Sequence, residues 1–208
     1  MTLRLLDLFC GRWGWSKSFA ARNWECVGVD LVDPPEIPEG CTFIKADILT
    51  MDAEWVAAGK FDFICASSPC EQFSVHGMKH FHPNPPYPEM GLKLFNHTRA
   101  LCEASGLPYV MENVRAAQKF VGDAVHHCGP FYLWGNAVPV LMAMGVKKGF
   151  VMGRDPVTGK RILAPGDVRS TWSGSKARRE AHAKTAIIPP ELSTAVVDYA
   201  EAILEQGL

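Results

Sequence analysis

The chain has 208 residues, which is enough to bury the core of one α/β domain with little left for a second. Hydrophobic residues make up 48% of it, but no apolar run approaches membrane-spanning length, so we expect a soluble, cytoplasmic protein rather than a membrane protein. Seven cysteines without framework spacing argue against a disulfide-linked secreted scaffold and predict reduced thiols.

Charge is unevenly distributed along the chain. The net charge is only -1, yet residues 147–184 contain ten Lys or Arg against three Asp or Glu, so this window carries +7 and the remainder -8. Such asymmetry is typical of a lobe that faces a polyanion beside a neutral or acidic core. A solvated basic surface without a partner is the alternative.

Short apolar runs and helical patterns alternate through the first 112 residues. The apolar runs predict strands at 3–9, 25–30, 41–47, 61–67 and 109–113. Between them, helical patterns occur at 15–22, 52–58 and 90–105. This alternation predicts βαβ units, and therefore an α/β fold with a mostly parallel sheet and helices on both faces.

Polar side chains stand where several predicted strands end. In open α/β sheets, ligands bind at the carboxyl ends of the strands. The residues at these positions are Asp7, Asp30, Asp47, Ser67 or Ser68, and Glu112.

The pattern changes after Glu112. Residues 131–134 read as a strand and 149–165 as a hairpin with its turn near 155–159. A final helix is predicted to start after Pro189 and Pro190 and to run to about Glu205. The stretch 68–90 is rich in Pro and His and is longer than an ordinary strand-to-helix connection, which predicts a functional lid or a disordered loop.

A glycine-bearing turn joins the first strand to the first helix. Gly11 and Gly14 in LLDLFCGRWGW let backbone amides approach a nucleotide-like ligand. By itself this pattern also fits a simple tight turn.

Two carboxylates follow at strand ends. Asp30 can accept hydrogen bonds from both ribose hydroxyls of an adenosine cofactor, with Asp33 as a fallback, and Asp47 can accept from the exocyclic amine of the adenine. For Asp30 and Asp47 the alternative is a helix N-cap.

Cys70 differs from the other cysteines in its position. It lies beyond a strand end, behind Pro69 and before the long loop, whereas Cys26 and Cys65 lie inside apolar strands as small hydrophobic residues. This position predicts an exposed, reactive thiol.

Glu112 is the candidate acid partner of Cys70. It ends an apolar strand, and burial there would raise the pKa of its carboxyl so that it holds a proton. A thiolate beside a protonated carboxyl can add to an electron-poor ring, because the acid neutralises the negative charge that develops on a ring nitrogen. The alternative is an ion pair with Arg115.

Three segments together resemble a known family. Residues 7–14, 69–74 and 112–114 are similar, in order and spacing, to hallmark motifs of the DNA cytosine-5 methyltransferases, and in particular of their short phage-type members. The resemblance covers the first 120 residues and about the last 25. It implies a Rossmann-like methyltransferase fold that uses S-adenosyl-L-methionine and acts on double-stranded DNA containing a target cytosine.

The resemblance also implies roles. Cys70 would attack C6 of a cytosine while Glu112 bonds N3, C5 would take the methyl group, and loss of the C5 proton would expel Cys70. The base must be flipped out of the duplex, and the loop 71–89 is expected to close over it. Pro69 and Asn113 would shape the pocket. The expected cofactor-binding residues are Phe9, Gly11, Gly14, Asp30 and Asp47.

The resemblance divides the chain into three parts. Residues 1–115 would form the cofactor-binding catalytic core, 116–176 a small inserted basic region for DNA recognition, and 177–208 a helix returning to the core. The expected DNA-binding residues are Ser74, Arg115, Arg169, Lys176, Arg178 and Arg179.

Two features depart from the family pattern. Trp13 stands where the family has a second glycine, and the later Gln-x-Arg-x-Arg motif is missing, so the contact to the cytosine carbonyl has only Arg115, Arg169 and Arg178 as candidates. Cysteine and histidine residues around 70–82 and 126–128 fit no closed zinc pattern, and no metal site is predicted.

Three other functions remain as alternatives. An exocyclic-amine methyltransferase would need an aromatic residue after a double proline, where this chain has Cys70. A catalytically silent DNA-binding protein of the same fold is disfavoured by the intact Cys70 and Glu112. A nicotinamide-dependent oxidoreductase would need a complete glycine fingerprint.

Overall fold

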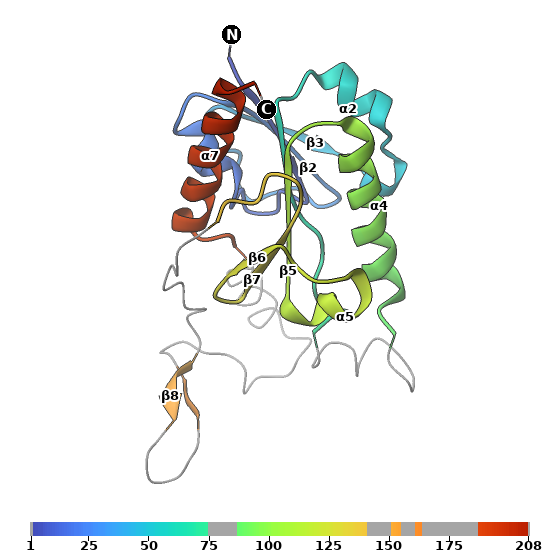
Figure 1. Ribbon diagram of the computed structural model, residues 1–208, viewed down its shortest axis with the longest axis vertical. Coiled ribbons are helices and arrows are strands. Elements are labelled where there is room, and N and C mark those ends of the chain that lie inside the picture. Colours follow the sequence, from blue (N-terminus) through green and yellow to red (C-terminus); the bar gives the residue numbers. More distant parts are fainter. Residues whose placement is uncertain (1, 75–86, 141–150, 155–160, 164–186, 208) are drawn as a thin grey trace.

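A seven-stranded sheet forms the centre of the computed structural model, which describes residues 2–74, 87–140, 151–154, 161–163 and 187–207. The strand order is β3-β2-β1-β4-β5-β7-β6. Neighbours are parallel from β3 to β5, whereas β7 is antiparallel to β5, and β6 to β7 (Figure 1). The strands are β1 (Arg4–Leu8), β2 (Glu25–Asp30), β3 (Cys41–Lys45), β4 (Phe63–Ser67), β5 (Tyr109–Asn113), β6 (His126–Cys128) and β7 (Phe131–Trp134).

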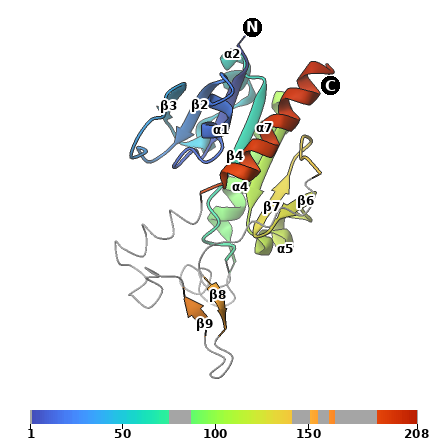
Figure 2. The same ribbon diagram turned by 90° about the vertical axis from the view of Figure 1, so that its left-hand side faces the viewer.

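Helices cover both faces of this sheet. On one face lie α1 (Ser16–Ala20) and α7 (Pro190–Glu205), and on the other α2 (Ala53–Gly59), α4 (Glu89–Ser105) and α5 (Gln118–Val121), as Figures 1 and 2 show. Short 3-10 turns occur at η1 (Ile48–Thr50) and η2 (Arg115–Ala117). The predicted α/β fold of the methyltransferase type, with helices on both faces, is confirmed.

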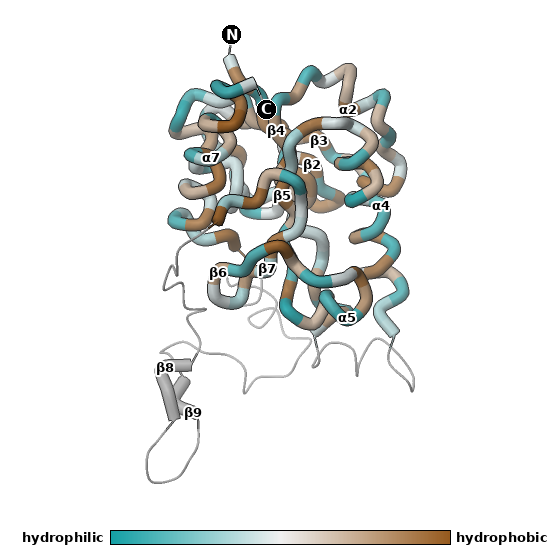
Figure 3. Tube along the Cα trace, viewed as in Figure 1, coloured by the Kyte–Doolittle hydropathy of each residue, from teal (hydrophilic) through white to brown (hydrophobic). Residues whose placement is uncertain are grey.

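The central strands β1, β2, β4 and β5 are buried along most of their length, because helices cover both faces of the sheet. Leu5 packs toward α1 and α7, whereas Leu6 and Leu8 pack toward the opposite helices, and all three are fully buried. The central strands therefore appear mainly brown in the hydropathy view (Figure 3).

The helix boundaries follow local sequence signals. Asp52 precedes α2 and its carboxylate accepts from Trp55 N at 2.8 Å, as an N-cap does. Helix α4 ends before Gly106, whose φ of 70° is the left-handed conformation common after helices. Helix α7 begins at Pro190, where a missing backbone donor costs nothing. The predicted helix 90–105 and the predicted final helix after Pro189 and Pro190 are confirmed to within one residue.

The later strands that the sequence predicts are also confirmed, and the structure adds one, β6. The predicted hairpin forms β8 (Val151–Arg154) and β9 (Arg161–Leu163), which pair antiparallel. Strands β6 and β7 lie within the predicted insert 116–176, yet they extend the core sheet. The three-part division of the chain stays a prediction, since much of 141–186 lies outside the described residues. No helix in the described part of the chain is long and apolar enough to span a membrane.

Candidate functional site

The turn after β1 adopts an unusual backbone conformation. Phe9, Gly11 and Trp13 have φ values of 61°, 47° and 63°, a left-handed region that non-glycine residues rarely enter. A Cβ on Gly11 would meet only the Phe9 carbonyl oxygen, at 3.8 Å. The space above this turn is therefore open to a ligand.

Asp30 ties this turn to the segment after β2. Its Oδ2 accepts from Gly11 N and its Oδ1 from Val32 N, both at 3.1 Å. Residues 31–40 contain no helix, so Asp30 is not a helix N-cap. Leu31 and Val32 beside it are exposed apolar residues.

Asp47 lies at the end of the neighbouring strand and has a local partner. Its Oδ1 accepts from Leu49 N at 3.0 Å, which makes Asp47 the N-cap of η1. The capping role that the sequence left open for Asp47 is therefore present. The second carboxylate oxygen is the one that a ligand amine would approach.

A buried carboxyl lies beneath the same turn. Asp7 is 1% exposed, its Oδ2 accepts from Ser16 Oγ at 2.6 Å, and its buried Oδ1 has no hydrogen-bond partner among the residues that the structure describes. Burial raises the pKa of Asp7 from 3.8 to about 7, although the Ser16 bond opposes the rise. The sequence placed Asp7 at a strand end but gave it no role.

Trp13 departs from the family pattern but points away from the open side of the turn. Its fully buried indole packs over β2 and donates from Nε1 to Glu36 O at 2.8 Å. A Cβ on Gly28 would lie 2.3 Å from the ring, so the missing side chain at Gly28 makes room for Trp13.

Helix α7 closes the other side of the turn. A Cβ on Gly14 would lie 2.7 Å from Ile188 N, and Ser193 Oγ donates to Trp15 O at 2.7 Å. Trp15 Nε1 in turn donates to Ser67 Oγ at 2.9 Å, at the end of β4. Gly14 thus permits close packing of the returning helix.

Cys70 begins a tight turn directly after β4. Its carbonyl oxygen accepts from Phe73 N and Ser74 N, both at 3.1 Å, and the residue is half-buried. Phe73 is fully buried against Phe95 of α4, with ring centroids 6.4 Å apart. Gln72 Oε1 accepts from the backbone N of Gly91 in α4 at 2.6 Å. The 70–74 segment is therefore anchored to the N-terminal end of α4.

Glu112 and Asn113 end the strand next to β4. Glu112 is 8% exposed and pairs in register with Ser67, three residues before Cys70. Asn113 Nδ2 donates to both the carbonyl and hydroxyl oxygens of Ser68 at 3.0 Å. The adjacent strands thus bring Cys70 and Glu112 to one edge of the sheet, with exposed Pro69 between Ser68 and Cys70.

Only two of the expected DNA contacts lie in the described residues. Arg115 is exposed at the start of η2, and Ser74 Oγ donates to Glu71 O at 3.0 Å. The others, Arg169, Lys176, Arg178 and Arg179, lie outside the described residues, as does segment 75–86 of the expected closing loop. Within the described part, no group of three or more His, Cys, Asp or Glu could hold a metal ion.

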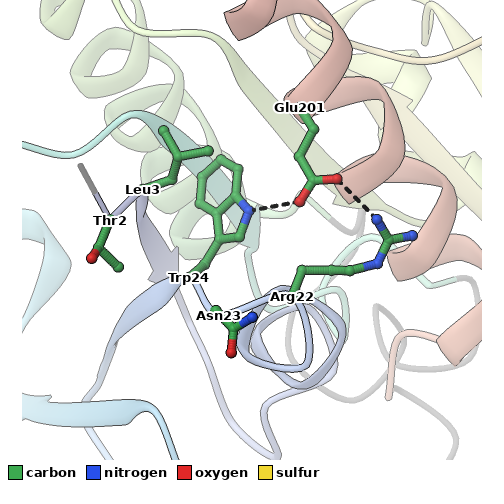
Figure 4. A pocket seen from close by; sticks show the side chains of 6 residues that line it. All are labelled: Thr2, Leu3, Arg22, Asn23, Trp24 and Glu201. Carbon is green, nitrogen blue, oxygen red and sulfur yellow. Dashed lines mark hydrogen bonds and ion pairs between the residues drawn. The ribbon is translucent and has the colours of Figure 1, made fainter.

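A pocket of about 300 Å³ lies at the opposite end of the sheet (Figure 4). Glu201 of α7 crosses it, accepting from Trp24 Nε1 at 3.1 Å and pairing with Arg22 at 2.9 Å. The pocket adjoins the first residues of β1 and β2 and the helix α7. It is therefore remote from Cys70, which follows the last residue of β4. It is lined by Thr2, Leu3, Arg22, Asn23, Trp24 and Glu201.

Sequence reasoning missed the residues that support the site. Gln72 and Trp15 act through partners distant in sequence, so no local pattern indicates them, and the strand-end position of Ser68 did not reveal its bond to Asn113. Gly28 was a possible signal of the Trp13 packing, because a glycine inside a strand often marks a place where another group comes close to the backbone.

Comparisons with known proteins agree with this architecture. Residues 3–123 match the family model of the C-5 cytosine-specific DNA methylases. The Entamoeba histolytica methyltransferase EhMeth has a similar fold, with a TM-score of 0.55 at 8% identity over 98% of this chain and 99% of that one. No curated protein matches the chain significantly.

Two DNMT2 structures give weaker matches. The mutant from Spodoptera frugiperda is 16% identical over 58% of this chain, with a TM-score of 0.39, and S. pombe Dnmt2 is 17% identical over 59%, with a TM-score of 0.42. The matched region spans only 38% and 37% of the length of those proteins.

Proposed function

Because the chain belongs to the C-5 cytosine-specific DNA methylase family, we propose that it transfers a methyl group from S-adenosyl-L-methionine to C5 of a cytosine in double-stranded DNA. The observation that carries the proposal is the pairing of two strand ends. Buried Glu112, near the end of β5, is the register partner of Ser67 at the end of β4, and half-buried Cys70 follows Ser67 by three residues. A nucleophile and an acid at one sheet edge are what addition to a pyrimidine ring requires.

The residues of the glycine turn fit the cofactor. The open space above Gly11 and the half-exposed carboxylate of Asp30, beside exposed Leu31, suit an adenosine with two ribose hydroxyls. Phe9, Gly14 and Asp47 complete the proposed set. When bound, S-adenosyl-L-methionine supplies an electrophilic methyl group.

The protein residues then act on the base. The Cys70 sulfur adds to C6 while Glu112 holds a proton at N3, so that negative charge does not accumulate on the ring. This addition makes C5 nucleophilic and able to take the methyl group. Removal of the C5 proton restores the ring and breaks the bond between C6 and the Cys70 sulfur. Asn113 keeps the turn before Cys70 in place through Ser68.

A base stacked in a duplex cannot reach this edge, so the target cytosine must be flipped out. We assign the phosphate contacts to the cations Arg115, Arg169, Lys176, Arg178 and Arg179, because cations supply most of the salt-sensitive affinity for a duplex, and to Ser74, whose hydroxyl can donate a hydrogen bond to a phosphate.

The test uses a duplex whose cytosines are replaced by 5-fluorocytosine. Fluorine cannot leave as a proton, so the Cys70 adduct should accumulate after methyl transfer from labelled cofactor and survive denaturation. Cys70→Ala should form none. Cys41→Ser is the matched control, because Cys41 is another half-buried thiol at the opposite end of the sheet, and it should react like the wild type.

Three outcomes would redirect the proposal. Methylation without an adduct, with the label on the exocyclic amine, would favour an amino-methyltransferase. DNA binding without any transfer would favour a catalytically silent DNA-binding protein. An adduct formed only with 5-fluorocytosine RNA would retain the chemistry and move the substrate from DNA to RNA.

A further inference from the structure

Two cysteines outside the proposed active site face each other across neighbouring strands. Cys26 of β2 and Cys41 of β3 are register partners in the parallel sheet. Register partners on adjacent strands point to the same face, and their backbones lie about 4.8 Å apart. That spacing is within the range of about 4.4 to 6.8 Å between Cα atoms that a disulfide spans.

The two thiols have different surroundings. Cys26 is 1% exposed, and its sulfur lies 3.6 Å from Ser16 O and 3.8 Å from Trp24 O, whereas Cys41 is half-buried. The backbone holds both in place, since Cys26 N donates to Gly40 O at 3.0 Å and Cys41 N to Pro38 O at 3.1 Å. One thiol is thus reachable from solvent and the other is held behind it.

The electrostatics distinguish the same two roles. A hydrogen bond from the Cys26 thiol lowers the pKa of Cys41, and nearby Lys17 lowers it further against the effect of burial. The same hydrogen bond, together with burial, raises the pKa of Cys26. A thiolate forms first at the accessible cysteine, which is typical of a redox-sensitive pair with a resolving partner.

We propose that Cys26 and Cys41 form a redox-active dithiol, which hydrogen peroxide closes to a disulfide between β2 and β3. The Cys41 thiolate attacks one peroxide oxygen, the O–O bond breaks, and the released hydroxide takes a proton to become water. Cys41 is then a sulfenic acid. The Cys26 sulfur attacks the Cys41 sulfur, the S–O bond breaks, and the departing hydroxide takes the Cys26 proton. Two thiols and one peroxide give one disulfide and two waters.

The experiment treats the full chain with limiting hydrogen peroxide, blocks remaining thiols with N-ethylmaleimide, and digests it without reduction with a protease that cleaves after glutamate, because Glu36 and Glu39 lie between the two cysteines. Mass spectrometry should find a peptide pair joined through Cys26 and Cys41, lacking two hydrogens, which dithiothreitol separates. In Cys26→Ser the reaction should stop at the Cys41 sulfenic acid, which dimedone traps. Cys102→Ser removes a buried thiol of α4 and should leave the cross-link unchanged.

A measurement on the wild type needs no folded variant. Iodoacetamide at neutral pH should alkylate Cys41 at least about tenfold faster than Cys102, because Cys41 combines access with thiolate character, whereas Cys102 is buried. The proposal is overturned if peroxide oxidises Cys70 while Cys26 and Cys41 stay reduced, or if the wild type accumulates a dimedone adduct at Cys41 without the cross-link. Either result leaves the methyl-transfer proposal untouched.

Discussion

Asn113 shows how much one buried amide contributes to the position of Cys70. It is fully buried, and its Nδ2 donates both hydrogens to Ser68, while its Oδ1 accepts from Val114 N at 2.8 Å. The Asn amide both donates and accepts hydrogen bonds, whereas an ionised carboxylate of the same shape only accepts them. Replacement by a carboxylate therefore keeps the shape and removes the donor.

We expect Asn113→Asp to lower the free energy of unfolding by about 2 kcal/mol, because it leaves buried acceptors of Ser68 unpaired beside a carboxylate. The rate of adduct formation should fall with it. Asn136→Asp is the control: Asn136 is exposed, its Oδ1 accepts from Tyr109 N, a bond that a carboxylate retains, and the substitution removes only the exposed 3.4 Å bond from its Nδ2 to Leu107 O. Urea denaturation compares the two, and equal decreases in stability would contradict the role given to Asn113.

The raised pKa of buried Asp7 leads to a prediction about how the free energy of unfolding depends on pH. Its pKa is about 7 in the folded protein against 3.8 ordinarily, so the folded state retains a proton that the unfolded chain releases. The stabilisation is fully present below pH 4 and is lost as the pH rises toward 7, with a slope of about 1.4 kcal/mol per pH unit. Urea denaturation from pH 4 to 8 measures this slope. In Asp7→Asn it should be smaller by that amount, and an unchanged slope would show that other groups titrate.

At the level of elements, the turn that carries Cys70 is part of the start of α4. Pro88 precedes this helix and provides no side-chain cap, so the amide of Gly91 takes its acceptor from Gln72. A residue two positions from the proposed nucleophile thus satisfies a helix donor that would otherwise lack one.

Gln72→Ala should cost about 1 kcal/mol of stability, the usual cost of removing a cap, and should slow adduct formation because the 70–74 turn is no longer anchored. Gln72→Glu keeps an acceptor at a helix N-terminus, where negative charge is favourable, and should restore both. The two readouts are urea denaturation and the single-turnover rate. If the glutamate variant is as slow as the alanine variant, the anchoring role is wrong.

The elements also show what sequence patterns can and cannot reveal. Strands β1, β2, β4 and β5 were predictable because burial on both faces makes them nearly continuous apolar runs between turn signals, and edge strand β3 because a short apolar run lies between turn signals. The place of β6 in the core sheet was not, because a three-residue strand carries too little periodicity. The packing of Ile188 on Gly14 joins residues far apart in sequence, and only the folded chain reveals it.

The same limit applies to the proposed site as a whole. Cys70, Glu112 and Asp30 were predictable as candidates because parallel strands have their carboxyl ends at one edge of the sheet, where ligands bind in open α/β folds. The buried state of Asp7 and the fit of Trp13 over Gly28 depend on packing between elements. The sequence around Asp47 is compatible with both ligand binding and capping, and its bond from Leu49 N shows the capping role.

The charge distribution of the whole chain leads to a prediction about DNA binding. The window 147–184 carries +7 although the chain is nearly neutral, so affinity for a duplex should depend on salt through this window. Each phosphate that the protein no longer neutralises reduces the slope of log K against log salt by about 0.9. Arg178→Ala combined with Arg179→Ala should therefore lower the slope by about 1.8 and weaken binding to all sequences similarly.

The control removes the same charge elsewhere. Lys17 and Lys45 are exposed on α1 and β3, where they pair with Glu36 and Asp33, and changing both lysines to alanine should leave the slope unchanged. Fluorescence anisotropy with a labelled duplex between 50 and 200 mM salt, roughly the range over which counterion release is large, measures both slopes. Equal slopes in the two double variants would mean that net charge, rather than phosphate binding by the basic window, governs affinity. A lower slope only in the arginine variant would place phosphates at that window, as a protein that flips a base and holds the duplex beside Cys70 requires.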